Sequence, residues 1–225
     1  MAFLLTIETT TKNCSVALFD NDNLIYLKEQ NSHKYSHAEQ ITLFIEEVLR
    51  ASKITLNELD GIILSSGPGS YTGLRIGTST AKGLCYSLGI PLISVSTLKA
   101  MAFTMLEDES YKYYCPMIDA RRMEVFASIY DQSNSEVREI RADIVDEYTY
   151  ANFLEDKVLF FGDGALKCKS VINNSNAYFV DGIFPSAKDM GVLGFDKFIK
   201  KNFEDVASFE PYYLKDFLIG KKKKF

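Results

Sequence analysis

A glycine-rich turn at residues 65–77 offers the most distinctive chemistry in the sequence. It follows an apolar run at residues 61–64, so it joins a strand to the helix that comes next. Glycine permits close backbone approach, and the Ser70 and Thr72 hydroxyls can cap a helix whose free N–H groups attract negative charge. The turn is therefore either an anion site or a packing device. The candidate anion or nucleotide contacts are Gly67, Gly69, Ser70, Thr72 and Gly73.

The turn departs from both common phosphate-binding motifs. No Gly-Lys-Ser/Thr follows it, which excludes a Walker loop, and a dinucleotide fingerprint would need its third glycine one residue earlier and no proline between. Neither motif therefore assigns phosphate binding to the turn, and the anion-site and packing interpretations both stay open.

Two acidic residues stand at the ends of predicted strands. Glu8 precedes a Thr-Thr-Thr-Lys turn whose hydroxyls and Lys12 could contact an anion, but the turn has no glycine for close approach. Asp119, followed closely by Arg121 and Arg122, could bind phosphate or form a salt bridge. We favour a structural use of the Glu8 turn and an internal or interface salt bridge at Asp119.

The two histidines, His33 and His37, have the i, i+4 spacing of a helical metal pair. Ser36 is expected to cap the helix, however, so His33 would precede it, and no third ligand is spaced nearby. We predict no metal site. No Ser-His-Asp or Cys-His arrangement can be assembled from these histidines either, so we predict no catalytic residues and no peptidase activity.

The elements that must position these residues follow from hydrophobic periodicity. Residues 2–8, 14–20 and 23–29 predict a three-strand meander, and apolar residues at helical spacing predict a helix over 37–51. The rest of the first half alternates: a strand at 61–66, a helix at 72–88, a strand at 91–95 and a helix from about 97.

The second half echoes the first, with a strand that ends in Asp119, a polar turn and a second strand at 123–130. The later elements are a strand at 158–161, a short helix, a strand near 177–180 and a helix at about 186–200. We divide the chain into a first lobe at 1–105, a smaller second lobe at 106–215 and a basic tail at 216–225. Lys221 to Lys224 in that tail could touch RNA, but a solubilising end is favoured.

Composition excludes several classes of protein. A net charge of −5 and a pI near 5.2 argue against a broad nucleic-acid-binding face. The chain lacks a basic, apolar leader and any stretch near the ~20 residues of a membrane span, so we expect a cytoplasmic protein with no membrane partner. Reduced, core-filling thiols are expected because the four cysteines are far apart: Cys14, Cys85, Cys115 and Cys168.

Five segments together resemble the TsaB (YeaZ) family. They are residues 67–77, 81–84, 91–98, 118–125 and 210–214, and they span nearly the whole chain. The resemblance implies an α/β, actin-like (ASKHA, RNase H-like) duplicated two-lobe fold. It also implies that residues 37–39, His-Ala-Glu, match a His-Ser-Glu segment that such chains carry without metal, although Glu8 is longer than the Asp usual in that family.

The same resemblance implies a non-catalytic scaffold in the complex that forms N6-threonylcarbamoyladenosine beside the anticodon of tRNAs. TsaD would perform the transfer and TsaE would supply an ATPase cycle. The protein alone would form a homodimer and meet tRNA only through the complex. We expect no intrinsic cofactor, with any ATP at the complex interface.

The helix at 72–88 carries small residues nearly all round, which suggests close approach of another backbone. Packing on its own sheet would explain them, while the family implies a partner surface built with the helix at 37–51. The expected contributors are Tyr71, Leu74, Arg75, Thr78 and Lys82.

Two alternative functions remain. A stand-alone ATP-dependent phosphotransferase would place Glu8 and Asp119 around magnesium, and the glycine missing from the Glu8 turn argues against it. The second alternative, a protein that only binds tRNA, is difficult to reconcile with the net negative charge of the chain.

Overall fold

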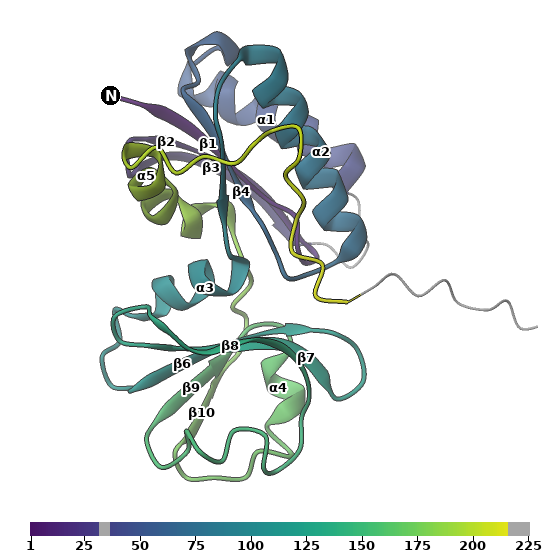
Figure 1. The fold of residues 1–225 in the computed structure, drawn as a ribbon, viewed down its shortest axis with the longest axis vertical. Helices are drawn as coiled ribbons and strands as arrows, with labels where there is room; N and C mark the ends of the chain where they lie inside the picture. Colours follow the sequence, from purple (N-terminus) through teal and green to yellow (C-terminus); the bar gives the residue numbers. More distant parts are fainter. Residues whose placement is uncertain (32–36, 216–225) are drawn as a thin grey trace, which may run out of the picture.

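The computed structural model describes residues 1–31 and 37–215, and within them the chain forms two five-stranded sheets (Figure 1). The first sheet has the order β3-β2-β1-β4-β5 and the second has the order β8-β7-β6-β9-β10. The first comprises β1 (Phe3–Glu8), β2 (Asn13–Asp20), β3 (Asn23–Asn31), β4 (Gly61–Ser65) and β5 (Leu92–Val95). The second comprises β6 (Tyr113–Asp119), β7 (Glu124–Asp131), β8 (Glu136–Ile144), β9 (Val158–Phe161) and β10 (Ala177–Val180).

The two sheets share one topology. In each, an antiparallel meander supplies three strands, and two further strands join parallel to the first strand of that meander. β6 therefore corresponds to β1, and Asp119 at its end corresponds to Glu8. The predicted duplication is confirmed by this pairing.

Helices cover both faces of the first sheet. α1 (His37–Ser52) and α2 (Tyr71–Leu88) pack on one face, while the 3-10 helix η2 (Ala187–Met190) and α5 (Gly191–Ile199) cover the other. The alternation of strand side chains produces these two layers, because Leu5 points toward α1 and α2 whereas Leu4 joins the cluster under α5. A sheet buried on both faces explains the nearly continuous apolar runs of β1 and β4.

The division between the lobes differs from the expected ranges in two respects. α3 (Thr97–Met105) packs on β6 and β7 in the second lobe, where Leu98 and Met101 meet its apolar cluster. α5, which we assigned to the second lobe, returns to the first sheet. α3 packs on the strands that directly follow it in the sequence, whereas α5 packs on a sheet formed by residues 3–95. The expected basic tail at 216–225 lies outside the described residues.

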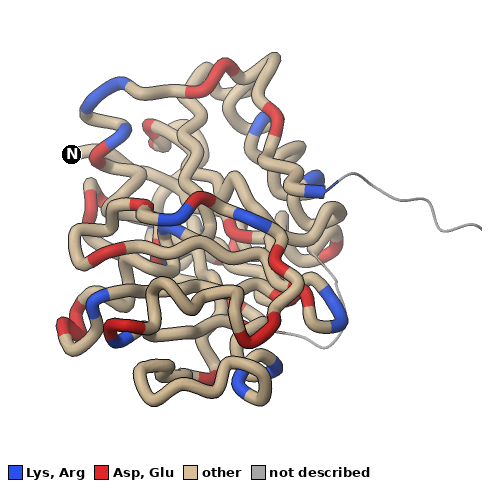
Figure 2. The backbone as a smooth tube through the Cα atoms, turned by 60° about the horizontal axis from the view of Figure 1, so that its bottom comes forward, with Lys and Arg blue, Asp and Glu red and all other residues tan. Residues whose placement is uncertain are grey.

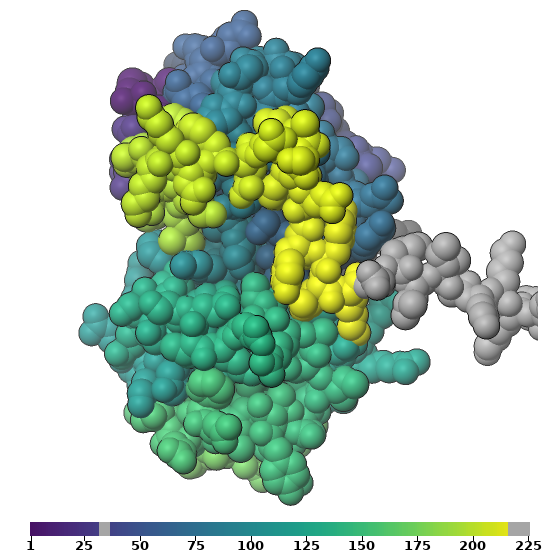
Figure 3. All heavy atoms as spheres, in the orientation of Figure 1, coloured from purple at the N-terminus to yellow at the C-terminus, as the bar shows by residue number. Residues whose placement is uncertain are grey.

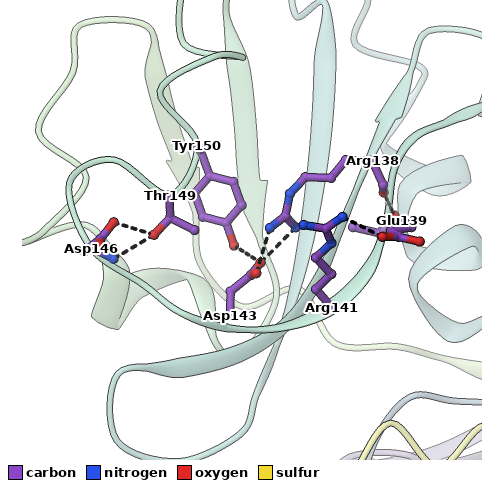
Figure 4. Close-up of polar contacts among 8 residues, drawn as sticks. Arg138, Glu139, Arg141, Asp143, Asp146, Thr149 and Tyr150 are labelled. Carbon is purple, nitrogen blue, oxygen red and sulfur yellow. Dashed lines mark hydrogen bonds and ion pairs between the residues drawn. The ribbon is translucent and has the colours of Figure 1, made fainter.

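β8 was not anticipated from the sequence, because charged residues interrupt its pattern at this sheet edge. A register shift against β7 places Arg138 opposite Ile129 and Asp143 opposite Val125, so these two charged side chains share the inner face. They form a bidentate salt bridge, with nitrogen–oxygen distances of 2.9 and 2.7 Å. The Tyr150 hydroxyl also donates to Asp143 at 2.9 Å (Figure 4). The pair is therefore hydrogen-bonded on several sides although it is nearly buried.

The remaining short helices are η1 (Leu56–Glu58) and α4 (Ala165–Cys168). The four cysteines are all buried and free, as expected for reduced thiols. Across residues 1–31 and 37–215, no helix combines the length and the apolar character needed to cross a membrane.

Candidate functional site

A cleft of about 380 Å³ lies between the two lobes. The first lobe contributes Thr10 and Thr11 after β1 together with residues 69–72 of the glycine turn, and the second lobe contributes residues 118–121 and Asp163. Residues 213–215 close one side, where the yellow C-terminal segment passes the junction of the lobes (Figure 3). The cleft brings together the loop after β1 and the end of β6.

The glycines of the turn make room for the backbone that follows β1. A Cβ atom at Gly69 would lie 2.5 Å from the Thr10 carbonyl oxygen, and one at Gly73 would lie 2.0 Å from the Thr9 carbonyl oxygen. At Gly77 it would lie 2.4 Å from Thr9 Oγ1. Any side chain at these positions would push the two segments apart, so close packing against the loop after β1 requires these glycines.

Several N–H groups of the same turn already donate within the chain. The Ser70 N–H donates to the Thr10 carbonyl at 2.7 Å, and the Gly67 N–H donates to Thr97 Oγ1 at 3.2 Å. Ser70 caps α2, since its hydroxyl accepts from the Gly73 N–H at 3.3 Å, as the sequence predicts. Thr72 is exposed on the cleft wall. Anion contact at this turn stays a prediction.

Glu8 is turned away from the cleft into the protein. Its side chain is 1% exposed, and its Oε1 accepts from the Thr10 N–H at 2.5 Å. Burial, which disfavours the ionised form, raises the pKa of Glu8 from 4.5 to about 7. This carboxyl group is thus partly neutral near pH 7, and it accepts a hydrogen bond from the turn that follows it.

Asp119 forms the salt bridge that we expected, although its partner is Lys167 rather than an adjacent arginine. Its Oδ1 also accepts from the Arg121 N–H at 3.0 Å, and its own N–H donates to Asp163 Oδ1 at 2.9 Å. Burial raises the pKa of Asp163. Because Glu8 is buried and Asp119 is paired with Lys167, the two carboxylates do not fit the role of paired magnesium ligands.

His37 joins α1 to the loop after β1. Its ring is buried, and Nε2 donates to the Thr11 carbonyl at 2.6 Å. Burial also lowers the pKa of His37, which favours the neutral ring. His33 and Ser36, the other members of the expected motif, lie outside the described residues. In the part of the chain that the structure describes, no group of three or more His, Cys, Asp or Glu could hold a metal ion.

The residues expected at a partner surface divide into three sets. Leu74 and Thr78 are 2% and 7% exposed and pack inside the subunit, so the structure corrects their assignment to that surface. Tyr71 packs its ring 4.9 Å from that of Tyr213. Lys82 donates to carbonyl groups of residues 207 and 209, while Arg75 is exposed and lies over the Tyr71 ring. These residues thus mostly serve contacts within the chain.

A separate groove of about 720 Å³ runs between α1 and α2. Sequence reasoning noted its small residues but did not select them, although Ser79, Gly83 and Ser87 recur every fourth position and so share one helix face. A Cβ at Gly83 would meet no atom within 4 Å. The groove is also lined by Thr42, Ile45, Glu46, Leu49, Arg50, Ile54, Thr55, Leu56, Thr80 and Leu84.

Comparison with protein families gives a match over residues 31–215 to the family described as "TsaD: tRNA N6-adenosine threonylcarbamoyltransferase". The chain is 29% identical to the tRNA threonylcarbamoyladenosine biosynthesis protein TsaB of Escherichia coli, over 97% of each chain. It is 31% identical to the protein of the same name from Buchnera aphidicola subsp. Schizaphis graminum, over 83% of this chain and 90% of that relative.

Solved structures show the same architecture. YeaZ from Pseudomonas aeruginosa superposes with a TM-score of 0.83 at 23% identity, over 95% of this chain and 100% of that one. The ADPNP-bound activator of 2-hydroxyisocaproyl-CoA dehydratase from Clostridium difficile superposes with a TM-score of 0.50 at 9% identity, over 91% and 98%. These likenesses, together with the repeated sheet topology, confirm the predicted actin-like α/β fold with two lobes.

Proposed function

The chain belongs to the TsaB (YeaZ) family, and from this membership we propose that it takes part in forming N6-threonylcarbamoyladenosine in tRNA as a non-catalytic scaffold subunit. Its partners in this proposal are a TsaD-like subunit that performs the transfer and a TsaE-like ATPase. It works in the cytoplasm, forms a homodimer when alone and meets tRNA only through the complex.

The state of Glu8 carries the non-catalytic part of the proposal. This residue stands at the end of β1, where the phosphotransferase alternative needs an ionised, accessible carboxylate, but it is buried and its pKa is raised to about 7. The loop after it lines the cleft at Thr10 and Thr11, but it also donates hydrogen bonds to the glycine turn and accepts them from it. These contacts support a structural role for this loop rather than a role in ATP hydrolysis.

The α1–α2 groove supports the scaffold part. Apolar side chains stand exposed on its two helices, with Leu43 61% and Tyr86 86% exposed, and Gly83 leaves room for an approaching helix. Tyr86 is one of the aromatic residue types that often supply much of the affinity at an interface, although it and Leu43 stand beside the groove rather than in its lining. We therefore place the TsaD-like partner, or a second copy of the chain, on this groove.

The charge distribution supports indirect contact with tRNA. Acidic and basic residues alternate along the described backbone rather than gathering into a broad basic face in this view (Figure 2). Direct binding would need clustered Lys and Arg to neutralise phosphates.

Co-purification with the TsaD-like protein of the same organism tests the proposal. The two chains should elute together in size-exclusion chromatography, and tRNA modification reconstituted with the TsaE-like protein should require this chain. Modification at full rate without it, or failure of the two chains to associate, would contradict the scaffold role.

A further inference from the structure

Residues 204–215, which we call the strap, return from α5 along the outside of the first lobe (Figures 1 and 3). The strap begins with a single β-bridge, in which the Glu204 N–H donates to the Leu92 carbonyl at 2.8 Å. Lys82 on α2 then holds the middle, since its Nζ donates to the Ala207 carbonyl at 2.9 Å. The strap is therefore attached to both β5 and α2.

The strap next contacts the glycine turn. The Tyr212 N–H donates to the Ser66 carbonyl at 2.7 Å, which adds a backbone hydrogen bond to the turn itself. The Tyr213 ring lies 4.9 Å from the Tyr71 ring at the start of α2. These contacts bring the strap to the mouth of the interlobe cleft, where residues 213–215 form part of the lining.

The strap ends on the other lobe. The Lys215 ammonium forms an ion pair with Glu124, the first residue of β7. Both side chains are partly exposed, at 47% and 19%. The Glu124 backbone is itself held, because its carbonyl accepts from Lys167 Nζ at 2.6 Å. The strap thus spans the cleft from a firmly attached stretch on the first lobe to an ordered position on the second.

Within residues 1–31 and 37–215, the chain otherwise passes between the lobes at two places, from β5 into α3 and from β10 into η2. Two-lobe folds close and open about such connections, because a few residues at each can absorb the change in backbone angles. A third connection across the cleft restricts that rotation. Because it ends in a half-exposed ion pair rather than in covalent structure, it can be released.

We propose that the strap sets the width of the interlobe cleft and that the Lys215–Glu124 ion pair is its releasable fastening to the second lobe. Release separates residues 213–215 from β7 and exposes the cleft walls at Thr10, Thr11 and Asp163. The strap itself stays on the first lobe through its backbone hydrogen bonds.

Charge reversal in the full-length protein tests this fastening by hydrogen–deuterium exchange. We expect Lys215→Glu and Glu124→Lys each to speed exchange about fivefold in peptides covering residues 9–12 and 118–122, as loss of a partly exposed pair predicts. The double variant should return these rates to within about twofold of the unmodified protein. The matched control is Lys200→Glu, which removes the exposed pair with Asp196 on α5 and should leave the cleft peptides unchanged.

A second test measures how salt changes hydrogen–deuterium exchange in the unmodified protein. Added salt screens partly exposed charges, so exchange in the same cleft peptides of the unmodified protein should quicken with salt, and that response should vanish in Lys215→Ala. The proposal is overturned if Lys215→Glu leaves cleft exchange unchanged, if the double variant fails to restore it, or if salt has no effect on the unmodified protein.

Discussion

Thr9 and Gly73 join the end of the first strand to the start of α2. The Thr9 hydroxyl donates to the Gly73 carbonyl at 2.8 Å, and the Thr9 carbonyl oxygen occupies the space that a Cβ at position 73 would need. The loop after β1 and the glycine turn are therefore one packed unit, and the small size of residue 73 is a condition for it.

We expect Gly73→Ala to lower the free energy of unfolding by about 1–3 kcal/mol, because the added methyl group must displace the Thr9 carbonyl oxygen, which lies 2.0 Å from its position. Gly83→Ala is the matched control in the same helix. Its methyl group meets open space, so the better helix propensity of alanine should raise stability by about 0.5–1 kcal/mol. Urea unfolding of both variants measures the difference, and equal effects would contradict the packing role of Gly73.

Gly83→Trp should block the α1–α2 groove without disturbing the fold, because position 83 is exposed and open. Co-elution with the TsaD-like protein and reconstituted tRNA modification should both be lost. The control is Ile199→Trp on α5, which is 63% exposed on the opposite face of the sheet. Thr78→Trp is unsuitable as a test because Thr78 is buried. If folded Gly83→Trp still forms the active complex, the partner surface lies elsewhere.

The purified protein should bind ATP weakly and hydrolyse it negligibly. Glu8 is buried, Asp119 is paired with Lys167, and the turn after Glu8 has no glycine to approach a phosphate. Isothermal titration calorimetry with magnesium and a phosphate-release assay measure both properties. Micromolar, magnesium-dependent binding with turnover would instead favour the phosphotransferase alternative.

Glu8 should make stability depend on pH. Its folded-state pKa, about 7, lies above the ordinary value of 4.5, so between these values the folded protein keeps a proton that the unfolded chain loses. Its contribution to stability is complete below about pH 4.5 and is lost as the pH rises through 7. The total loss corresponds to about 3 kcal/mol.

Glu8→Gln should abolish this contribution, since an amide oxygen can still accept from Thr10. Urea unfolding of both proteins at several pH values measures it. The stability of the variant relative to the unmodified protein should increase from pH 4 to pH 8, whereas a constant difference would show that Glu8 does not titrate as described.

Removing one partner of the Arg138–Asp143 ion pair should strongly destabilise the protein. Asp143→Ala leaves a nearly buried guanidinium without its partner, so we expect a loss of about 3–5 kcal/mol in unfolding free energy. Arg141→Ala removes the neighbouring pair with Glu139, which is exposed, and should cost less than about 1 kcal/mol. Thermal and urea unfolding compare the two pairs, both visible in Figure 4. Similar small losses would show that burial does not distinguish them.

The sequence by itself determined the fold class, most elements and the repeated strand-acid pattern. Hydrophobic patterns predict the elements, because the apolar run of β1 and the helical spacing of α1 indicate which side chains must be buried together. The fold class followed from the resemblance of five segments to the TsaB (YeaZ) family. Ser70 as the cap of α2 and the importance of the glycine turn also followed from residue types alone. β8 was missed because its inward Arg138 and Asp143 do not follow an apolar pattern, and their common face depends on a register shift with β7.

Only the tertiary structure decided what those features contact. α2 carries small residues nearly all round, so its faces differ little in hydrophobicity. The sequence therefore does not show that Leu74 and Thr78 face inward while Gly83 faces the groove. The return of α5 and the strap to the first lobe depends on pairings across more than 100 residues, such as that of Lys82 with residue 207. Such contacts follow from the complementary shapes and hydrogen-bonding groups of distant segments, which no local pattern contains.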